Sequence, residues 1–151
     1  FSHAMPIILQ PPFVAMLMTM SGWFAHSLLG PWQTILSMPT IGGVLVIAGF
    51  SFLLWARLLF TSRKTTLFVG RASSDLVRDG PFRFSRNPMY VGVLVSLLGI
   101  ALWVGTVPMF VAVLAVFATL NFLHIPREER MLRESFGEQY LSYSKEVRRW
   151  L

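Results

Sequence analysis

Two arginines and two carboxylates are the residues of this sequence best suited to bind a small charged ligand. Arg83 and Arg86 lie in one charged segment, and Glu128 and Glu129 lie in the next. A guanidinium group can hold a carboxylate by paired hydrogen bonds, and a carboxylate can hold an amine. We therefore expect a site for a zwitterionic ligand that carries both a carboxylate and an amine.

The arginines precede the predicted start of a helix. Gly80-Pro81 indicates a turn, and Asn87 followed by Pro88 is typical of an N-cap and a first helical residue. The positive end of the helix dipole and its unpaired amides would attract an anion. A basic loop before a capped helix explains the same residues without a ligand. The prediction of a binding site therefore depends on their combination with the two downstream carboxylates.

The charged residues are confined to two windows, which indicates a membrane protein. Residues 57–86 hold seven basic and two acidic residues, and residues 127–149 hold six basic and five acidic residues, which together make up all 13 Lys+Arg and all 7 Asp+Glu. A charge at the centre of a membrane helix costs roughly 3 kcal/mol. The uncharged stretches, residues 1–56 and 87–126, are therefore predicted to lie in the membrane and the charged windows in water.

The predicted fold is an all-α integral membrane protein with about four transmembrane helices and a cytosolic amphipathic C-terminal helix. The four apolar segments are 6–29, 41–60, 89–104 and 108–125. The last two form a helical hairpin within 87–126, broken at residues 105–108. Its first helix carries a stripe of small residues that would let another helix approach closely, in a dimer or within the bundle: Gly92, Ser96 and Gly99.

The tail, residues 126–151, is predicted to be a helix that begins at Pro126, because proline suits a first helical turn. Spacings of 4, 4, 3 and 4 place five side chains on one face of it: Leu132, Phe136, Tyr140, Tyr143 and Val147. An even number of spans puts both termini on one side, and the positive-inside rule makes that side cytoplasmic. The loop 61–86 and the tail would then face each other.

Residues 1–4 are interpreted as a cloning remnant, residues 5–60 as two N-terminal transmembrane helices, and residues 61–151 as a cofactor-binding core. The absence of cysteine excludes disulfides and thiolate chemistry. The net charge of +6 is attributed to basic loops beside the spans, and no nucleic-acid partner is expected. No spacing of histidines and carboxylates indicates a metal, and no glycine-rich nucleotide fingerprint follows a strand.

Two motifs resemble one enzyme family. Gly80-Pro81-Phe82-Arg83 followed by Arg86-Asn87-Pro88-Met89-Tyr90 resembles the signature of the isoprenylcysteine carboxyl methyltransferase family, which includes phospholipid N-methyltransferase relatives. A second match lies in the tail: Glu128-Glu129, Leu132, Phe136-Gly137, Tyr140 and Tyr143. Asn87 stands where many members carry histidine, and asparagine can form hydrogen bonds but cannot titrate. The resemblance covers about residues 76–150.

The resemblance implies an integral membrane methyltransferase that uses S-adenosyl-L-methionine and releases S-adenosyl-L-homocysteine. Arg86 and Glu129 would have catalytic roles. The implied cofactor-binding residues are Arg83, Asn87, Pro88, Met89, Tyr90, Glu128 and Glu129. The acceptor would be lipophilic and reached from the bilayer, an isoprenylcysteine-like carboxylate in preference to a lipid amine.

The expected location is a prokaryotic inner membrane, among membrane lipids, with both termini and the active site in the cytoplasm. Two alternatives remain open from the sequence. One is a non-catalytic membrane scaffold or sensor of the same fold, and the other is a sterol-reductase-like enzyme that uses NADPH. Binding of S-adenosylmethionine, of NADPH or of neither would distinguish the three. The sequence does not predict an oligomeric state.

Overall fold

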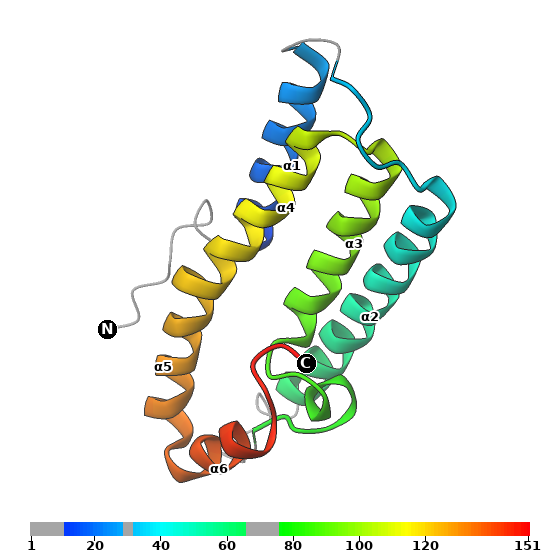
Figure 1. Ribbon diagram of the computed structural model, residues 1–151. Helices are drawn as coiled ribbons and strands as arrows, with labels where there is room; N and C mark the ends of the chain where they lie inside the picture. The colour runs from blue at the N-terminus through cyan, green and yellow to red at the C-terminus, as the bar shows by residue number, and fades with distance from the viewer. Residues whose placement is uncertain (1–10, 29–31, 66–75) are drawn as a thin grey trace.

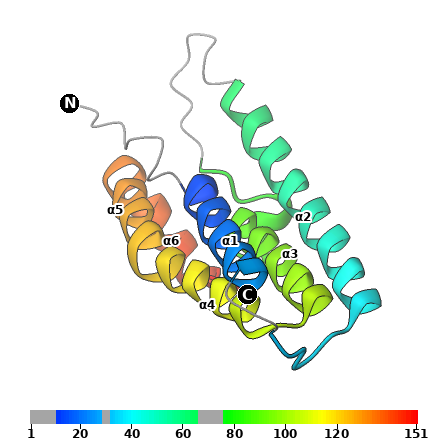
Figure 2. The same cartoon turned by 90° about the horizontal axis from the view of Figure 1, so that it is seen from above.

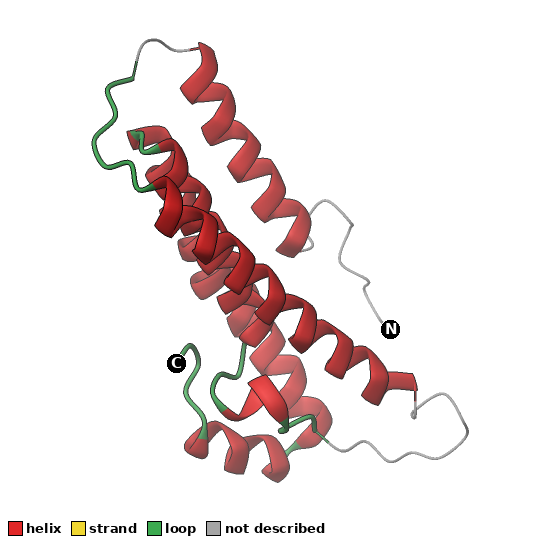
Figure 3. Cartoon of the chain, turned by 90° about the vertical axis from the view of Figure 1, so that its right-hand side faces the viewer, coloured by secondary structure: helices red, strands yellow, loops and turns green. Residues whose placement is uncertain are grey.

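The computed structural model describes residues 11–28, 32–65 and 76–151, and it describes the side chains of all of these except 11–14 and 63–65. Over this part of the chain every regular element is helical, and no strand occurs (Figure 3). The all-α prediction is therefore confirmed for the described residues. The proposed remnant at residues 1–4 lies outside them, as do residues 6–10 and 29 of the first predicted span.

The main helices are α1 (Pro11–Leu28), α2 (Pro39–Thr65), α3 (Pro88–Val104), α4 (Val107–Thr119), α5 (Ile125–Phe136) and α6 (Glu138–Glu146). A 3₁₀ turn, η2 (Gly80–Arg83), precedes α3, and a π-helical turn, η3 (Leu120–His124), joins α4 to α5. Seen from above, α2 lies at one side of the bundle and α4–α5 at the other, with α1 and α3 between them (Figure 2).

Two helices among the described residues are long and apolar enough to cross a membrane: Pro39–Ser62 and Val107–Phe136. Helix α3 is apolar but shorter. Only 11% of the apolar window of Pro39–Ser62 is buried inside the protein. The core helix of a soluble protein would be mostly buried, so this outward apolar surface is suited to lipid contact.

Helices α2 and α3 approach closely through small residues. A Cβ added to Gly49 of α2 would lie 2.6 Å from the amide nitrogen of Ser96, and one added to Gly99 would lie 2.6 Å from the carbonyl oxygen of Gly42. The backbones therefore touch where side chains would normally separate them. Of the two uses expected for the small-residue stripe, the structure shows packing within the bundle.

Helices α3 and α4 form a helical hairpin. Helix α3 ends at Val104, and Gly105 adopts a left-handed conformation with φ of +76°, which glycine tolerates at a helix C-terminus. Helix α4 begins at Val107 after the buried Thr106, whose hydroxyl lies 3.1 Å from Nδ1 of His26 in α1. Helix α1 packs along α4 and η3 through Ala15, Val116 and Leu120.

The tail differs from the single helix that the sequence predicts. Helix α5 does not start afresh at Pro126, because it continues the long helix Val107–Phe136 through the π-helical turn. The N–H of Ile125 bonds to the carbonyl of Leu120, and this wider turn accommodates Pro126, which has no N–H to donate. Gly137, with φ of +49°, then ends α5 and begins α6, so the predicted apolar stripe is divided between two helices.

The described charged residues gather at one end of the bundle. Figure 1 shows α5, α6, η2 and the end of α2 at this end, with the α3–α4 turn at the other. The described part of the loop, residues 76–86, meets the tail here, because the Tyr143 hydroxyl donates a hydrogen bond of 2.7 Å to the carbonyl of Phe82. This agrees with the predicted juxtaposition of loop and tail.

Candidate active site

The segment before α3 is held by the end of the chain. We call residues 147–151 the C-terminal strap. The backbone N–H of Arg86 donates to the carbonyl of Arg148 at 3.0 Å, and the side-chain amide of Asn87 donates to the carbonyl of Arg149 at 2.9 Å. The hydroxyl of Ser85 also reaches the Arg149 carbonyl, at 3.3 Å. The strap therefore fixes residues 85–87 directly before the first turn of α3.

Arg86 and Glu129, from the two separate motifs, form an ion pair of 3.1 Å. Arg149 holds the same carboxylate with two hydrogen bonds, from Nε to Oε1 at 3.1 Å and from Nη2 to Oε2 at 2.8 Å. The side chain of Glu129 is 6% exposed, and Arg133 lies at 4.0 Å from Oε2. A buried carboxylate needs such partners, because an unpaired charge is costly away from water.

The arrangement around Glu129 has a surplus of positive charge. One carboxylate faces the three guanidinium groups of Arg86, Arg133 and Arg149. Nη1 of Arg86 also donates to the hydroxyl of Tyr140 at 3.2 Å, but its Nε is buried without a hydrogen-bond partner. Buried donors are rarely left unpaired. A surplus of positive charge with a vacant donor beside the start of α3 is suited to an anionic ligand.

A second contact joins the motifs at the first turn of α3. The hydroxyl of Tyr90 in α3 donates a short hydrogen bond to the carboxylate of Glu128 in α5, and both side chains are partly buried. Arg86 lies just before α3 and Tyr90 lies in its first turn, and their partners Glu129 and Glu128 are consecutive residues of α5. The Arg86–Glu129 and Tyr90–Glu128 pairs therefore form one continuous patch.

The remaining predicted residues of this motif occupy the start of α3. Asn87 is at the N-cap position as predicted, but its side chain makes no capping hydrogen bond and instead holds the strap. Pro88 is buried at the first turn, and Met89 beside it is partly buried. The sequence identified the N-cap residue correctly, but its side chain bonds to the Arg149 carbonyl and not to the first turn of α3.

Arg83 does not join Arg86. Its side chain is exposed and lines a separate polar hollow of about 440 Å³ together with Arg78, Tyr143 and Glu146. Burial raises the pKa of Tyr143 to about 12, so its hydroxyl stays protonated and donates to the Phe82 carbonyl at neutral pH. The two arginines that the sequence pairs therefore lie in different surroundings.

Sequence reasoning did not single out Arg149 or Trp150. The indole of Trp150 donates to Oδ1 of Asn121 at 3.1 Å, and its ring centroid lies 5.2 Å from that of Phe117. Both contacts fasten the strap to the long helix. A signal was present in the sequence, because a glutamate at a membrane boundary needs cations, and Arg148-Arg149 are the last ones in the chain.

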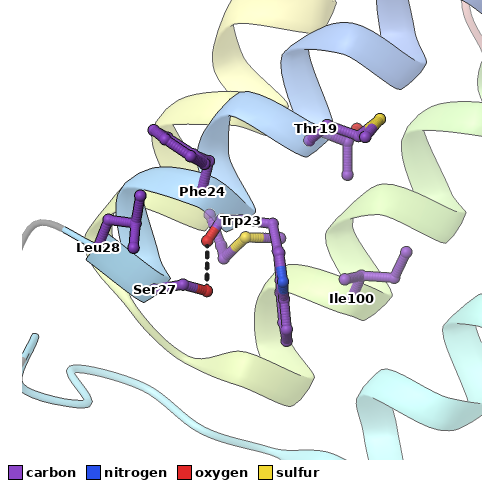
Figure 4. A pocket seen from close by; sticks show the side chains of 8 residues that line it. Thr19, Trp23, Phe24, Ser27, Leu28 and Ile100 are labelled. Carbon is purple, nitrogen blue, oxygen red and sulfur yellow. Dashed lines mark hydrogen bonds between the residues drawn. The ribbon is translucent and has the colours of Figure 1, made fainter.

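A second, apolar hollow of about 490 Å³ lies toward the opposite end of the bundle. Figure 4 shows Trp23, Ser27 and Leu28 of α1 on one side of it and Ile100 of α3 on the other. Thr19, Met20, Phe24 and Met109 complete its lining. Among the described residues there is no group of three or more histidine or acidic side chains placed to bind a metal.

Comparison with known proteins gives a family match that spans the site. The model of the phospholipid methyltransferase family matches residues 37–139, which include both halves of the patch. An uncharacterized protein of Haemophilus influenzae is 38% identical over 63 residues, which is 42% of this chain and the whole of that protein. No solved structure matches this chain.

Proposed function

Because this chain belongs to the phospholipid methyltransferase family, we propose that it transfers a methyl group from S-adenosylmethionine to a lipophilic acceptor. The observation that carries this proposal is the contact between the two motifs. Arg86, just before α3, meets Glu129, and Tyr90, in the first turn of α3, meets Glu128. The family match gives no support to the non-catalytic scaffold or to the NADPH-dependent reductase.

The residues of the patch fit the amino-acid part of S-adenosylmethionine, which carries a carboxylate and an ammonium group. Arg86 has a buried N–H without a partner, and this donor suits the carboxylate. Glu128 accepts one hydrogen bond from Tyr90 and has further acceptor capacity for the ammonium group. Asn87, Pro88 and Met89 would form the wall of the site beside them.

Glu129 is assigned to holding Arg86 and not to proton transfer. Guanidinium groups face both of its oxygens, with Arg86 and Arg149 at Oε1 and Arg149 and Arg133 at Oε2. A carboxylate engaged in this way is not free to approach the acceptor, because both of its oxygens already contact guanidinium groups. Its contribution would be the placement of Arg86.

S-adenosylmethionine, when bound, would supply a methyl group on a positively charged sulfur; the methyl group would bond to a lone pair of the acceptor as its bond to sulfur breaks, and the thioether S-adenosylhomocysteine would leave. The protein then has to align the acceptor and keep water out. The Arg86 and Tyr90 pairs would set the position of the cofactor relative to α3. The apolar helices around this patch would bring the acceptor from the bilayer.

A carboxylate acceptor fits this site better than an amine. A carboxylate attacks in its charged form and needs no base, and the two carboxylates of the patch are engaged by Arg86, Arg149 and Tyr90. A lipid amine is the second candidate, because the family description names phospholipids. Its proton would have to pass to Glu128, the carboxylate with fewer partners.

The proposed topology has four crossings, made by α1, α2, α3 and the long helix α4–α5. The charged residues at one end of the bundle would place the site at the cytoplasmic face of a prokaryotic inner membrane (Figure 1). The apolar hollow is assigned to the acceptor's hydrocarbon chain. Ile100 lies ten residues after Tyr90 on α3, about 15 Å along the helix axis, which a fatty or prenyl chain can span.

Calorimetric titration of the detergent-purified protein with S-adenosylhomocysteine tests the proposal. We expect micromolar binding to the wild type and at least tenfold weaker binding to Arg86→Ala and Glu129→Ala. Arg130→Ala is the matched control, because Arg130 lies on α5 beside Glu129 but is exposed. A folded wild-type protein that binds no S-adenosylhomocysteine would contradict the proposal, and binding of NADPH would favour the reductase.

The acceptor class can be tested in vesicles with S-adenosylmethionine that carries a labelled methyl group. A methyl ester formed on a carboxylate releases labelled methanol in mild alkali, whereas an N-methyl group does not. We expect alkali-labile label with vesicles that contain a prenylated cysteine. Alkali-stable label with vesicles of amine-bearing phospholipid would assign the amine instead.

A further inference from the structure

The C-terminal strap contributes a charged side chain to the site that neither motif contains. We propose that Arg149 is a positioning residue for cofactor binding: it holds Glu129 so that Arg86 keeps donors free for the carboxylate of the ligand. This inference rests on the proposed function, because it concerns the same site. Arg149 touches no part of the proposed ligand position itself and acts through Glu129 and Arg86.

The two arginines hold Glu129 in different ways. Arg149 contacts both oxygens, with its Nε at 3.1 Å from Oε1 and its Nη2 at 2.8 Å from Oε2, whereas Arg86 contacts only Oε1 through Nη1 at 3.1 Å. Arginine has five N–H donors in a fixed fork. With the paired geometry taken by Arg149, Arg86 cannot form a paired contact with Glu129, and its Nε remains buried without a partner.

The backbone places Arg149 where it can make this contact. Its carbonyl accepts hydrogen bonds from the Asn87 amide at 2.9 Å and the Ser85 hydroxyl at 3.3 Å. On either side, the Arg148 carbonyl accepts the N–H of Arg86, and the Trp150 indole donates to Asn121. The guanidinium therefore extends from a segment held by two successive backbone carbonyls and by the side chain of the next residue.

The same contacts give Asn87 a role that needs no titration. Its side-chain amide is a donor to the Arg149 carbonyl, and a neutral histidine ring N–H is also a donor. Asparagine in place of the histidine found in many family members therefore still supplies a donor for the contact that fixes the strap. This position acts on the geometry of Arg149 and not as an acid or base.

Removal of Arg149 would change the donors that Arg86 presents. Glu129 would keep Arg86 at 3.1 Å and the more distant Arg133 at 4.0 Å, and Oε2 would lose its closest partner. Arg86 would then turn a second N–H toward the free oxygen, because paired arginine–carboxylate contacts are favoured. The donor available to the ligand carboxylate would be lost while the fold remained.

The test compares two ligands on the full-length protein in detergent. S-adenosylhomocysteine carries the amino-acid carboxylate, and 5′-methylthioadenosine carries the same nucleoside and thioether without it. We expect Arg149→Ala to weaken binding of S-adenosylhomocysteine at least tenfold and binding of 5′-methylthioadenosine less than twofold. Arg149→Lys, which keeps the charge but not the fork, should give an intermediate loss for S-adenosylhomocysteine alone.

Arg148→Ala is the matched control. Its side chain is exposed, and alanine retains the carbonyl that accepts the Arg86 N–H, so both ligands should bind as they bind the wild type. An equal loss of both ligands in Arg149→Ala, or no loss of either, overturns the inference. If Arg149→Ala does not fold, Arg149→Lys provides the test: a loss of affinity for S-adenosylhomocysteine alone supports the inference, and equal losses for both ligands overturn it. A wild type that binds neither ligand contradicts the proposed function itself.

Discussion

The hydroxyl of Tyr90 donates a hydrogen bond to the carboxylate of Glu128, which lies 38 positions later in the chain. The contact joins the first turn of α3 to the first turn of α5. Helix α3 and the long helix α4–α5 are thus connected at their open end by polar groups, while the other end is connected by the backbone turn at Gly105.

Tyr90→Phe tests this contact because it keeps the ring and removes only the hydroxyl. A hydrogen bond to a charged group contributes about 1.5–3 kcal/mol, so we expect kcat/KM for methyl transfer to fall at least tenfold. Glu128→Gln should have a similar effect. The double variant should lose little more than either single variant, and fully additive losses would show that the two side chains do not act as a pair.

Gly42→Ala should destabilise the bundle, because the new methyl group would lie 2.6 Å from the carbonyl oxygen of Gly99 and 2.9 Å from the backbone nitrogen of Trp103. Overpacking of this kind costs roughly 1–3 kcal/mol. Thermal unfolding in detergent would show a lower midpoint.

Gly43→Ala is the control for that variant, since its methyl group would meet only the Trp103 ring, at 3.4 Å. Alanine is the better helix former, so this variant should unfold at the wild-type temperature or slightly above. Equal midpoints for the Gly42 and Gly43 variants would contradict the close packing of α2 on α3.

Tyr143→Phe should lower stability at neutral pH and make it less sensitive to alkali. Burial raises the pKa of Tyr143 from 10.0 to about 12, so the folded state keeps a proton that the unfolded chain releases. The stabilisation is present below pH 10.0 and is lost as the pH rises through about 12. The loss of the hydrogen bond to Phe82 should cost about 1 kcal/mol at neutral pH.

The measurement for Tyr143 is the unfolding midpoint of both proteins from neutral pH to pH 12. The gap between wild type and Tyr143→Phe should narrow above pH 10.0, the ordinary pKa of the phenol. A gap that stays constant over this range would show that the hydroxyl is not buried in the folded protein.

Arg83→Ala and Arg86→Ala should differ in their effect on S-adenosylhomocysteine binding. Arg86 pairs with the buried Glu129, whereas Arg83 is exposed beside the separate polar hollow. We expect a loss below threefold for Arg83→Ala and above tenfold for Arg86→Ala, measured by calorimetry. A comparable loss of affinity in both variants would show that Arg83 belongs to the cofactor site, as the sequence motif predicts.

The features that sequence predicted well are those that depend on local composition. The hairpin turn could be located because glycine, threonine and proline interrupt an apolar stretch at residues 105–108, and the structure turns there. The stripe of Gly92, Ser96 and Gly99 could be predicted to meet another helix, because small residues recur on one face. The identity of the partner helix required the fold, since any apolar span satisfies that pattern.

The features that the sequence did not predict depend on the direction that the chain takes after a helix ends. Periodicity places Tyr140 and Tyr143 on one face with Leu132, but Gly137, with a positive φ, redirects the chain between Leu132 and the tyrosines. The strap that follows has no periodic pattern of apolar residues, so the contact of Arg149 with Glu129 cannot be predicted from residue spacing. The sequence predicted that the two motifs meet, but it did not predict that Arg86 pairs with Glu129, which the structure shows.

The π-helical turn Leu120–His124 determines the direction in which the later side chains of the long helix point. Such a turn is equivalent to one extra residue, and each residue of an α-helix rotates the chain by about 100°. Deletion of a single residue there would swing Glu128 and Glu129 about 100° around the axis, away from Tyr90 and Arg86. The length of the long helix is thus suited to crossing a bilayer, and the π-helical turn sets the direction in which its two carboxylates point.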